Sequence, residues 1–390
     1  MAINALPVRG TKDFLPKEAE IRDYVQNIIL STYKEFGFNR IQTPIMEDIE
    51  RLDKSDGGEN LSLIFKLIKR GQKLDLSKEN LTEKDLVDSG LRFDLTMPLS
   101  RYYANNRAEL PNPFKTIQVD KVFRAERPQK GRLREFYQCD IDILGDKSIN
   151  AEMDLINVTA TTLKRIGFND FVIKINDRRI LAQRILDAGF GEEDISLVCI
   201  IFDKQDKIGI DGVEKELLEN GFEEAKVKAF LNADTTASDE IKQIIETLPE
   251  ANLVYDPSLV RGMGYYTGII FEIHSEEFSS ALGGGGRYDK MVGKFLGQDV
   301  PAVGFSIGFE RICAILLDKD YKIEGTKKLV LVYDDNQNFA DVLKEQKELI
   351  SQGYVVNLLK RSKKLGKQID ELVNLGYKFL SQNGEMKNIG

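Results

Sequence analysis

Four short stretches of the 390-residue sequence combine arginines with glycines or aromatic residues, the residue types from which sites for phosphorylated ligands are built. The densest is the stretch 123–142, in which two extended segments flank a loop that carries Arg127, Lys130, Arg132 and Arg134. Arginine offers permanently charged, bidentate donors that suit phosphate groups. The stretch therefore predicts a phosphate-binding hairpin, and a solvated charged loop is the alternative.

The other three stretches are rich in glycine. Residues 259–268 place Arg261 beside paired tyrosines and glycines, which indicates a polar pocket that backbone approaches closely. Residues 283–289 read Gly-Gly-Gly-Gly-Arg-Tyr-Asp and match neither GxxxxGK[ST] nor GxGxxG. Four successive glycines indicate a sharp bend or a backbone that another group approaches. Residues 304–311 predict a strand that runs into a helix, with Arg311 near the start of the helix.

The composition limits the chemistry that is available. The sequence has one histidine, His274, and three widely separated cysteines, Cys139, Cys199 and Cys313. These counts exclude an HExxH zinc site, a CxxC metal site and a disulfide framework. Catalysis must then rest on Arg, Lys, Asp, Glu, Tyr or a bound metal. We expect His274 to lie on the surface and the cysteines to lie in the core, with Cys139 the one that could adjoin a pocket.

Length and charge indicate the general class of protein. With 42% hydrophobic and 30% charged residues, the chain suits a globular protein of two or more domains. No run of 18 apolar residues is present, and the first residues do not resemble a secretory signal, so we expect a cytoplasmic protein. The net charge of −8 disfavours coating of DNA. Residues 326–390 nevertheless hold eleven Lys/Arg against eight Asp/Glu, including a cluster between Lys360 and Lys367.

Hydrophobic spacing predicts the elements that position these residues. In the first part of the sequence we expect helices over 17–36 and 150–166, an extended segment interrupted at Pro44 over 38–46, and strands over 62–69, 90–94, 114–124 and 135–144. The last strand alternates and places Phe136, Gln138, Asp140 and Asp142 on one face. This pattern predicts a functional sheet surface, and a plain solvent-facing sheet is the alternative.

The second part of the sequence changes character. A strand over 171–175 precedes five predicted helices, which together indicate a mainly helical insertion at about 170–250: 179–188, 192–202, 211–220, 223–231 and 238–247. Strands are predicted again over 265–274 and 301–308, followed by a helix over 310–317. Beyond a charged linker, strands over 329–333 and 355–358 alternate with helices over 338–352 and 364–375, which predicts a small α/β domain with a parallel sheet. No closing strand or helix is expected after Leu380.

Taken in order, these stretches resemble the class II aminoacyl-tRNA synthetases, and among them the histidyl-tRNA synthetases. Residues 9–16 and 36–47 are similar to the family's opening and motif 1, residues 124–138 to motif 2, and residues 304–311 to motif 3. Residues 259–268 and 282–289 are similar to two segments peculiar to histidyl-tRNA synthetases. The resemblance covers roughly residues 7–380, with the motifs in the family's order.

The resemblance implies an α+β fold. Residues 1–320 would form an antiparallel class II catalytic sheet flanked by helices, with the helical insertion inside it, and residues 326–390 a short α/β anticodon-binding-like domain. It further implies a homodimer built through motif 1, in the cytoplasm, that acts on tRNA and L-histidine and contacts neither DNA nor a membrane.

The reaction implied is that of a histidine–tRNA ligase, which activates histidine with ATP and Mg²⁺ and transfers it to the 3′ end of its tRNA. The attacking carboxylate is already ionised at neutral pH, so the enzyme has mainly to position the reactants and stabilise charge on the phosphoryl oxygens. The roles that the resemblance assigns are catalysis by Arg261 and Arg124, and ATP binding by Arg124, Glu126, Phe136 and Arg311. It assigns histidine binding to Asp94, Thr96, Gln138, Asp142, Tyr265, Tyr266 and Tyr288. It assigns contact with the tRNA acceptor end to Gln129, Arg132 and Arg134, and implies no protein ligand to a metal.

The sequence departs from the family in a few places, and one alternative stays open. Gly264 stands where the family usually has Asp, and Asp94 and Asp142 stand where many bacterial members have Glu. The alternative is a non-catalytic paralogue similar to the regulatory subunit of ATP phosphoribosyltransferase. Such paralogues typically lose the arginines of motifs 2 and 3, which are present here. A synthetase for another amino acid would conflict with residues 259–268.

Overall fold

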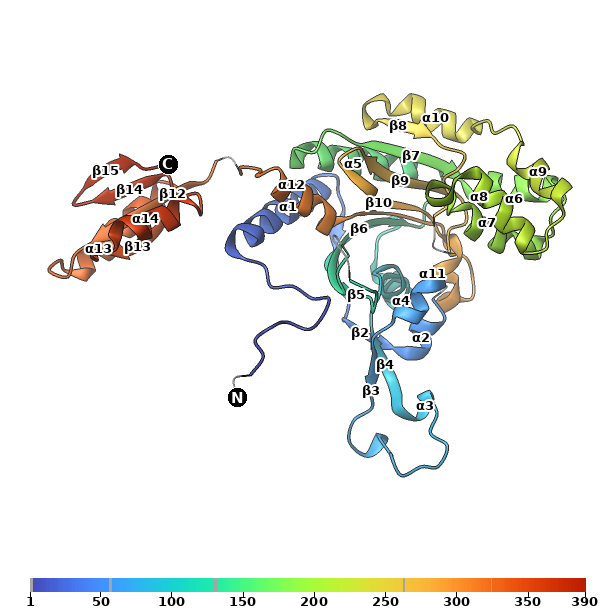
Figure 1. Ribbon diagram of the computed structural model, residues 1–390, viewed down its shortest axis with the longest axis horizontal. Coiled ribbons are helices and arrows are strands. Elements are labelled where there is room, and N and C mark those ends of the chain that lie inside the picture. The colour runs from blue at the N-terminus through green and yellow to red at the C-terminus, as the bar shows by residue number, and fades with distance from the viewer. Residues whose placement is uncertain (1–2, 56–57, 129–131, 262–263, 324) are drawn as a thin grey trace. The chain divides into compact units, whose positions relative to one another are not determined.

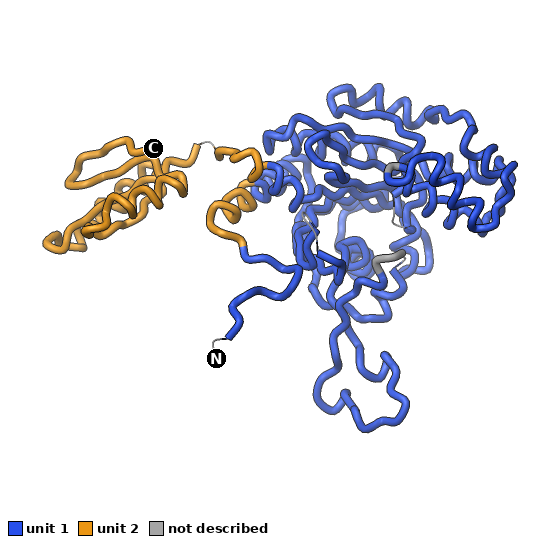
Figure 2. The backbone as a smooth tube through the Cα atoms, viewed as in Figure 1, with its two compact units in different colours: residues 1–13, 25–315 blue, residues 14–24, 316–390 orange. Residues whose placement is uncertain are grey.

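The computed structural model describes residues 3–55, 58–128, 132–261, 264–323 and 325–390 (Figure 1). The chain divides into two compact units (Figure 2). The first comprises residues 1–13 and 25–315, and the second comprises residues 14–24 and 316–390. No helix among the described residues is long and apolar enough to span a membrane.

The first unit is built on an eight-stranded sheet. Its strands, in spatial order, are β1 (Asn39–Arg40), β5 (Phe114–Phe123), β6 (Glu135–Leu144), β11 (Ala302–Ile307), β10 (Phe278–Arg287), β9 (Ile269–Ser275), β7 (Val172–Asp177) and β8 (Leu253–Tyr255). The six strands from β5 to β7 pair antiparallel, whereas β1 and β8 pair parallel at the two edges. The antiparallel centre agrees with the class II resemblance.

The register of the central strands aligns residues that are far apart in the sequence. Asp140 of β6 lies opposite Ser306 of β11, and Ser306 lies opposite Gly284 of β10. Gly284 in turn lies opposite Glu272 of β9. Directly opposed residues project from the same face of a sheet. One face therefore carries a continuous row from Asp140 to Glu272.

The four successive glycines 283–286 lie within β10, in a run of paired strand rather than at a sharp bend. Of the two interpretations of this motif, the structure supports the one in which another group approaches the glycine backbone closely. A Cβ atom at Gly284 would lie 2.7 Å from Nη1 of Arg261, and one at Gly304 of β11 would overlap the carboxylate of Asp142. Glycine at these two positions leaves room for side chains that lie directly on the sheet.

Helices pack around this sheet and fix its strands. The longer ones in the first unit outside the insertion are α1 (Pro16–Glu35), α4 (Thr96–Asn106), α5 (Asn150–Ile166), α11 (Asp289–Leu296) and α12 (Phe309–Asp318). The first residues of α1 and the last residues of α12 belong to the second unit. Helix α5 matches its predicted bounds, buries an apolar face against β6 and β11, and ends at Gly167 in the left-handed conformation.

A small three-stranded sheet also belongs to the first unit. It orders β2 (Met46–Asp48), β4 (Val87–Leu91) and β3 (Lys66–Ile68), beside α2 (Ile49–Asp53) and α3 (Glu83–Leu86). The extended segment predicted over 38–46 is thus two short strands in different sheets, separated around Pro44, which has no N–H to donate to a ladder. The strand predicted over 62–69 shortens to β3 because residues 58–63 form a 3₁₀ helix.

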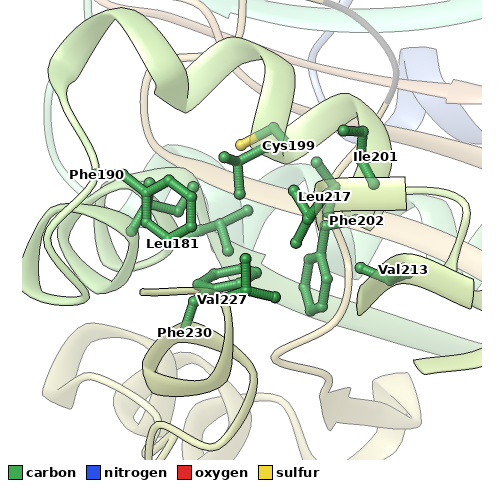
Figure 3. Close-up of a cluster of buried hydrophobic side chains, with 12 residues drawn as sticks. Leu181, Phe190, Cys199, Ile201, Phe202, Val213, Leu217, Val227 and Phe230 are labelled. Atoms are coloured by element: carbon green, nitrogen blue, oxygen red, sulfur yellow. The ribbon is translucent and has the colours of Figure 1, made fainter. Parts of the chain in front are cut away.

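The predicted helical insertion is present between β7 and β8. It consists of α6 (Arg178–Asp187), α7 (Ile195–Phe202), α8 (Gln205–Glu219), α9 (Glu224–Leu231) and α10 (Asp239–Thr247). Apolar side chains of α6 to α9, including Leu181, Phe202 and Phe230, pack into one buried cluster (Figure 3). Val260, next to Arg261 in the chain, belongs to the same cluster.

The second unit holds a four-stranded sheet in the order β13 (Tyr354–Lys360), β12 (Lys327–Tyr333), β14 (Phe379–Gln382) and β15 (Glu385–Asn388), with α13 (Phe339–Ser351) and α14 (Leu365–Val373). The first three strands are parallel, whereas β15 adds antiparallel. The prediction that no closing strand follows Leu380 is wrong. Asn383 and Gly384 both have positive φ and close a tight hairpin, and this Asn-Gly pair was the signal in the sequence.

Candidate active site

Two adjoining cavities lie over the glycine-containing face of the eight-stranded sheet. The smaller has a volume of about 140 Å³ and the larger about 210 Å³. Among the residues that the structure describes, five line both cavities: Arg124, Gln138, Arg261, Gly284 and Ser306. A ligand that spanned the two cavities would therefore pass the side chains of both Arg124 and Arg261.

The smaller cavity gathers every residue to which the family resemblance assigns histidine binding. Asp94 and Thr96 reach it from the start of α4, Gln138 and Asp142 from β6, and three tyrosines from the segments around β9 and β10. The complete set is Asp94, Thr96, Gln138, Asp142, Tyr265, Tyr266 and Tyr288. These residues are separated by up to nearly half of the chain, and only the sheet register and the packing of α4 bring them together.

The electrostatics of the smaller cavity are unusual, because three carboxyl groups are buried in it. Burial raises the pKa of Asp94, although the nearby Arg124 offsets part of this effect. Burial also raises the pKa of Asp142 to about 7, despite a stabilising hydrogen bond from Tyr288. The pKa of Asp140 is raised well above its ordinary value by burial and by the charge of Asp142. Such crowding favours a ligand that brings positive charge or hydrogen-bond donors.

The tyrosines form an aromatic wall beside these carboxyl groups. The rings of Tyr265 and Tyr266 have centroids 4.8 Å apart, and those of Tyr265 and Tyr288 lie 6.0 Å apart, nearly edge-on. The Tyr288 hydroxyl donates a hydrogen bond of 2.6 Å to Oδ1 of Asp142. The cavity is thus flat-walled and acidic, which suits a small planar ring that carries nitrogen donors.

Two buried acceptor atoms complete the smaller cavity. Neither Oε1 of Gln138 nor Oδ1 of Asp140 has a hydrogen-bond partner within the described part of the chain. An unsatisfied buried acceptor is costly, so each atom is suited to receive a donor from a ligand. The resemblance did not assign Asp140 to the site. The sequence could have indicated Asp140, because the alternating pattern places it on the same strand face as Gln138 and Asp142.

The larger cavity is lined by all four residues to which the resemblance assigns ATP binding, namely Arg124, Glu126, Phe136 and Arg311. The guanidinium of Arg124 lies 5.2 Å from the centre of the Phe136 ring, and its Nε donates to the carbonyl of Phe93 at 3.0 Å. Burial lowers the pKa of Arg124 and of Arg311, but both remain cationic because an arginine pKa is far above neutral. The cavity has the cationic and aromatic lining that a nucleotide requires.

The three residues assigned to the tRNA acceptor end have different placements. Arg132 lines the larger cavity and forms an ion pair of 2.8 Å with Glu126. Arg134 does not line it, because its Nε donates to the carbonyl of Glu126 at 2.9 Å and its backbone N–H donates to Gly10. Gln129 lies outside the described residues, as do Lys130 and Gly131 of the same loop.

Arg261 is held by Glu272, to which the resemblance assigns no role, and Glu272 is in turn bonded to His274. Its Nη1 forms an ion pair with Oε2 of Glu272, and Oε1 of Glu272 accepts a hydrogen bond of 2.8 Å from Nε2 of His274. Burial opposes the charge of Glu272, but the bonds from His274 and Arg261 outweigh it and lower its pKa to about 2. His274 is therefore more than a surface residue. The sequence could have indicated this contact, because a spacing of two residues from Glu272 places both side chains on one face of a strand.

The backbone before Arg261 is also fixed. Nδ2 of Asn176 in β7 donates to the carbonyl of Leu259 at 2.9 Å, and Val260 is buried in the apolar core of the insertion. Gly264, which replaces the family's usual Asp, lies exposed at a turn.

A third and wider hollow lies on the insertion, between α6, α9 and α10, with a volume of about 610 Å³. Of the residues to which the resemblance assigns a role, none that the structure describes lines this hollow. Three of the charged residues at its wall pair with one another, since Arg179 forms ion pairs with both Asp177 and Glu240. The two cavities over the sheet are therefore the candidate active site.

Comparison with known proteins agrees with this arrangement. The model of the histidyl-tRNA synthetase family matches residues 10–312. The chain belongs to the histidyl-tRNA synthetase family. It is 41% identical to a histidine–tRNA ligase of Leifsonia xyli subsp. xyli, over 97% of this chain and 95% of the relative. A crystal structure of histidyl-tRNA synthetase from Nostoc sp. PCC 7120 superposes with a TM-score of 0.78 at 26% identity, covering 100% of this chain and 97% of that one.

The alternative of a regulatory paralogue is not favoured within this family. A structure from Bacillus halodurans C, described as an ATP phosphoribosyltransferase regulatory subunit/histidyl-tRNA synthetase, has a TM-score of 0.76 but is only 19% identical, covering 97% of this chain and 98% of that one. That likeness shows a shared fold alone. The relatives that match at about 40% identity carry the name of the ligase.

Proposed function

We propose that this chain is a histidine–tRNA ligase, which couples ATP cleavage to the formation of histidyl-adenylate and then of histidyl-tRNA. One observation carries the proposal. A small acidic and aromatic cavity adjoins a cationic one, and Arg124 and Arg261 stand in the wall that they share. A reaction between an amino acid and a nucleotide phosphate requires the two reactants to meet at such a wall.

The proposed activation step follows from this placement. Histidine in the smaller cavity directs its carboxylate toward the shared wall, where it attacks the α-phosphorus of ATP, and pyrophosphate leaves. Arg124 and Arg261 stabilise the charge that develops on the phosphoryl oxygens, while Arg311 contacts the departing phosphates. The ring of Phe136 and the carboxylate of Glu126 hold adenine. The carboxylate nucleophile needs no general base, since it is ionised at neutral pH.

The proposed specificity for histidine rests on the acidic cavity. The imidazole offers one donor and one acceptor, or two donors when protonated, and the ligand also carries an α-ammonium group. Asp94, Asp142 and Gln138 accept these donors, and the tyrosines exclude water from the ring. An apolar amino acid of similar size would leave the carboxyl groups buried without a partner, which is costly.

We further propose that ATP enters with Mg²⁺ bound to its phosphates. Among the described residues no group of three or more His, Cys, Asp or Glu side chains could hold a metal ion by itself. Mg²⁺ in nucleotide sites is commonly held by substrate phosphates and water, with one or two carboxylates. The proposal therefore assigns no protein ligand to the ion: Mg²⁺ would be held by the phosphates of ATP and by water, and it would shield the charge on the phosphates.

Transfer to tRNA, dimerisation and location belong to the same proposal. Arg132, which lines the larger cavity, would contact the tRNA acceptor end, the role that the resemblance also assigns to Gln129 and Arg134. Residues 326–390 would contact the anticodon side as a small α/β domain. Exposed Ile45 and Met46, in the segment that resembles motif 1, support a homodimer. A cytoplasmic location follows from the reaction, since its product is consumed in translation.

Histidine-dependent exchange of pyrophosphate into ATP tests the activation step directly. The full-length protein with saturating ATP and Mg²⁺ should exchange pyrophosphate only when histidine is present, and charging of tRNA with labelled histidine should follow. Histidine binding without exchange would refute the proposal and would favour a regulatory paralogue that senses histidine.

A further inference from the structure

His274 is the only histidine of the chain, and none of the roles described so far uses it. Its side chain lies on β9 at the edge of the candidate active site, partly exposed to solvent. Nε2 of His274 bonds to one carboxylate oxygen of Glu272, and the other oxygen is paired with Nη1 of Arg261. The three side chains thus form one continuous chain of polar contacts that ends at the wall between the two cavities.

Arg261 depends on such support for its position. Its backbone has φ of 68°, in the left-handed region, which is unfavourable for a residue with a side chain. Its Nε is buried and has no hydrogen-bond partner among the described residues. The guanidinium lies directly over Gly284, which has no side chain, so the residue beneath it provides only backbone atoms. Its orientation therefore rests largely on its contacts with Glu272 and Tyr266.

Glu272 in turn needs a second partner. Its side chain is largely buried, at 18% exposure, and a buried carboxylate with one free oxygen can rotate about its last torsion. The hydrogen bond from His274 occupies the oxygen that Arg261 does not use. Because Glu272 is ionised at neutral pH, its oxygen accepts and Nε2 of His274 donates.

We infer that His274 is a positioning residue for the activation step: through Glu272 it fixes the guanidinium of Arg261 where the α-phosphate of ATP must lie. This inference rests on the proposed role of Arg261. It adds a residue outside both cavities to the machinery, and it predicts that His274 affects the rate of the chemical step rather than the binding of histidine. A residue that only stabilised the end of β9 would not have this signature.

The test compares substitutions of His274 in the full-length protein. His274→Leu keeps side-chain volume and removes the donor, whereas His274→Gln places an amide N–H at a similar reach. Glu276→Gln, at the exposed turn that follows β9, is the matched control. Each variant is assayed by histidine-dependent pyrophosphate exchange for kcat and for the two KM values, and by thermal unfolding. Arg261→Ala and Glu272→Gln, alone and combined with His274→Leu, complete the set.

His274→Leu should lower kcat about tenfold, the equivalent of one charge-assisted hydrogen bond, with the KM for histidine changed by less than about twofold. His274→Gln should recover kcat to within about twofold of the wild type, and Glu276→Gln should match the wild type. In the Glu272→Gln background, His274→Leu should have no further effect, because the link to Arg261 is already broken.

Several results would overturn the inference. The inference fails if His274→Leu leaves kcat unchanged. It also fails if the Leu and Gln variants lose kcat equally and both have a lowered Tm. It fails as well if the effects of His274→Leu and Glu272→Gln on kcat are additive. If Arg261→Ala is inactive while His274→Leu has the wild-type kcat, this inference fails and the proposed function stands. If the wild type shows no exchange, or Arg261→Ala keeps full activity, the proposed role of Arg261 fails, and this inference fails with it.

Discussion

The phenol of Tyr288 donates a hydrogen bond of 2.6 Å to Oδ1 of Asp142 across the strands of the catalytic sheet, and both side chains are buried. Gly304 on the strand between them leaves the space in which this carboxylate lies. The bond favours the ionised carboxylate, and burial disfavours it. The balance leaves the pKa of Asp142 at about 7. Asp142 can thus change its protonation state when a cationic ligand enters.

Asp142→Ala should raise the KM for histidine far more than the KM for ATP. A bound imidazole would lose a buried charged partner, which costs about 1.5–3 kcal/mol of binding free energy and corresponds to a rise of roughly 10- to 150-fold in the KM for histidine. Pyrophosphate exchange with each substrate varied in turn measures both constants, and Tyr333→Phe in the second unit serves as a remote control. Equal effects on the two KM values would place Asp142 outside the amino-acid pocket.

The stability of the ligand-free protein should fall as pH rises through the window set by Asp142. Between the ordinary value of 3.8 and the raised value of about 7, the folded chain holds this proton and the unfolded chain releases it. The free energy of unfolding therefore decreases with pH across that window, by at most about 4 kcal/mol for this one group.

Asp142→Asn removes that titration, so its unfolding free energy should depend less steeply on pH and should exceed that of the wild type at pH 8. Urea unfolding at pH 5, 6, 7 and 8 measures the difference. A residual slope is expected because Asp94 and Asp140 also have raised pKa values. A variant with the same slope as the wild type would contradict the buried placement of Asp142.

Arg261→Ala should abolish most of the activation rate while histidine still binds. Loss of one group that stabilises charge in the transition state costs about 3–4 kcal/mol, or roughly 10²- to 10³-fold in kcat. Calorimetric titration of histidine onto the variant measures the binding that should survive. A variant that loses histidine binding to the same degree as activity would mean that Arg261 acts in the ground state.

Gly304→Ala should weaken histidine binding, because the new Cβ would overlap the carboxylate of Asp142 and crowd Tyr288. Overpacking of this kind typically costs about 1–3 kcal/mol in stability as well. Gly366→Ala is the matched control, since a Cβ at that position in α14 meets open space. The control should be neutral or up to about 1 kcal/mol more stable. Equal behaviour of the two variants would show that Gly304 provides no room for the carboxylate.

Lys363 and Lys364 should contribute to tRNA binding and leave activation unchanged. They follow β13 in the basic cluster of the second unit, in which Lys360 and Arg361 already pair with Asp335 and Asp334. Replacing both lysines with Ala should weaken tRNA binding. It should also flatten the slope of log affinity against log salt by about one per lost phosphate contact. Lys215→Ala in the insertion is the control, and a slope equal to that of the wild type would remove these lysines from the interface.

Local spacing determined a large part of the fold. The alternating pattern of residues 135–144 gave β6 with its bounds, and the helical spacing of residues 150–166 gave α5, because these patterns depend only on the period of each element. The hairpin of β14 and β15 was missed, although Asn383 and Gly384 carried its turn signal. For residues 283–286 the sequence did not distinguish a sharp bend from a strand that another group approaches closely, since glycine permits both.

The sequence by itself determined which residue types are available for the chemistry and, through the ordered motifs, the family. The tertiary structure decided which of these residues lie close together in one site. Cross-strand register alone sets Glu272 opposite Gly284 and Gly284 opposite Ser306, and a slip of one residue would turn each side chain to the other face. The burial that raises the pKa of Asp142, and the link from His274 through Glu272 to Arg261, arise from contacts between strands. Spacing along one chain cannot fix such contacts, because they depend on which elements pack together.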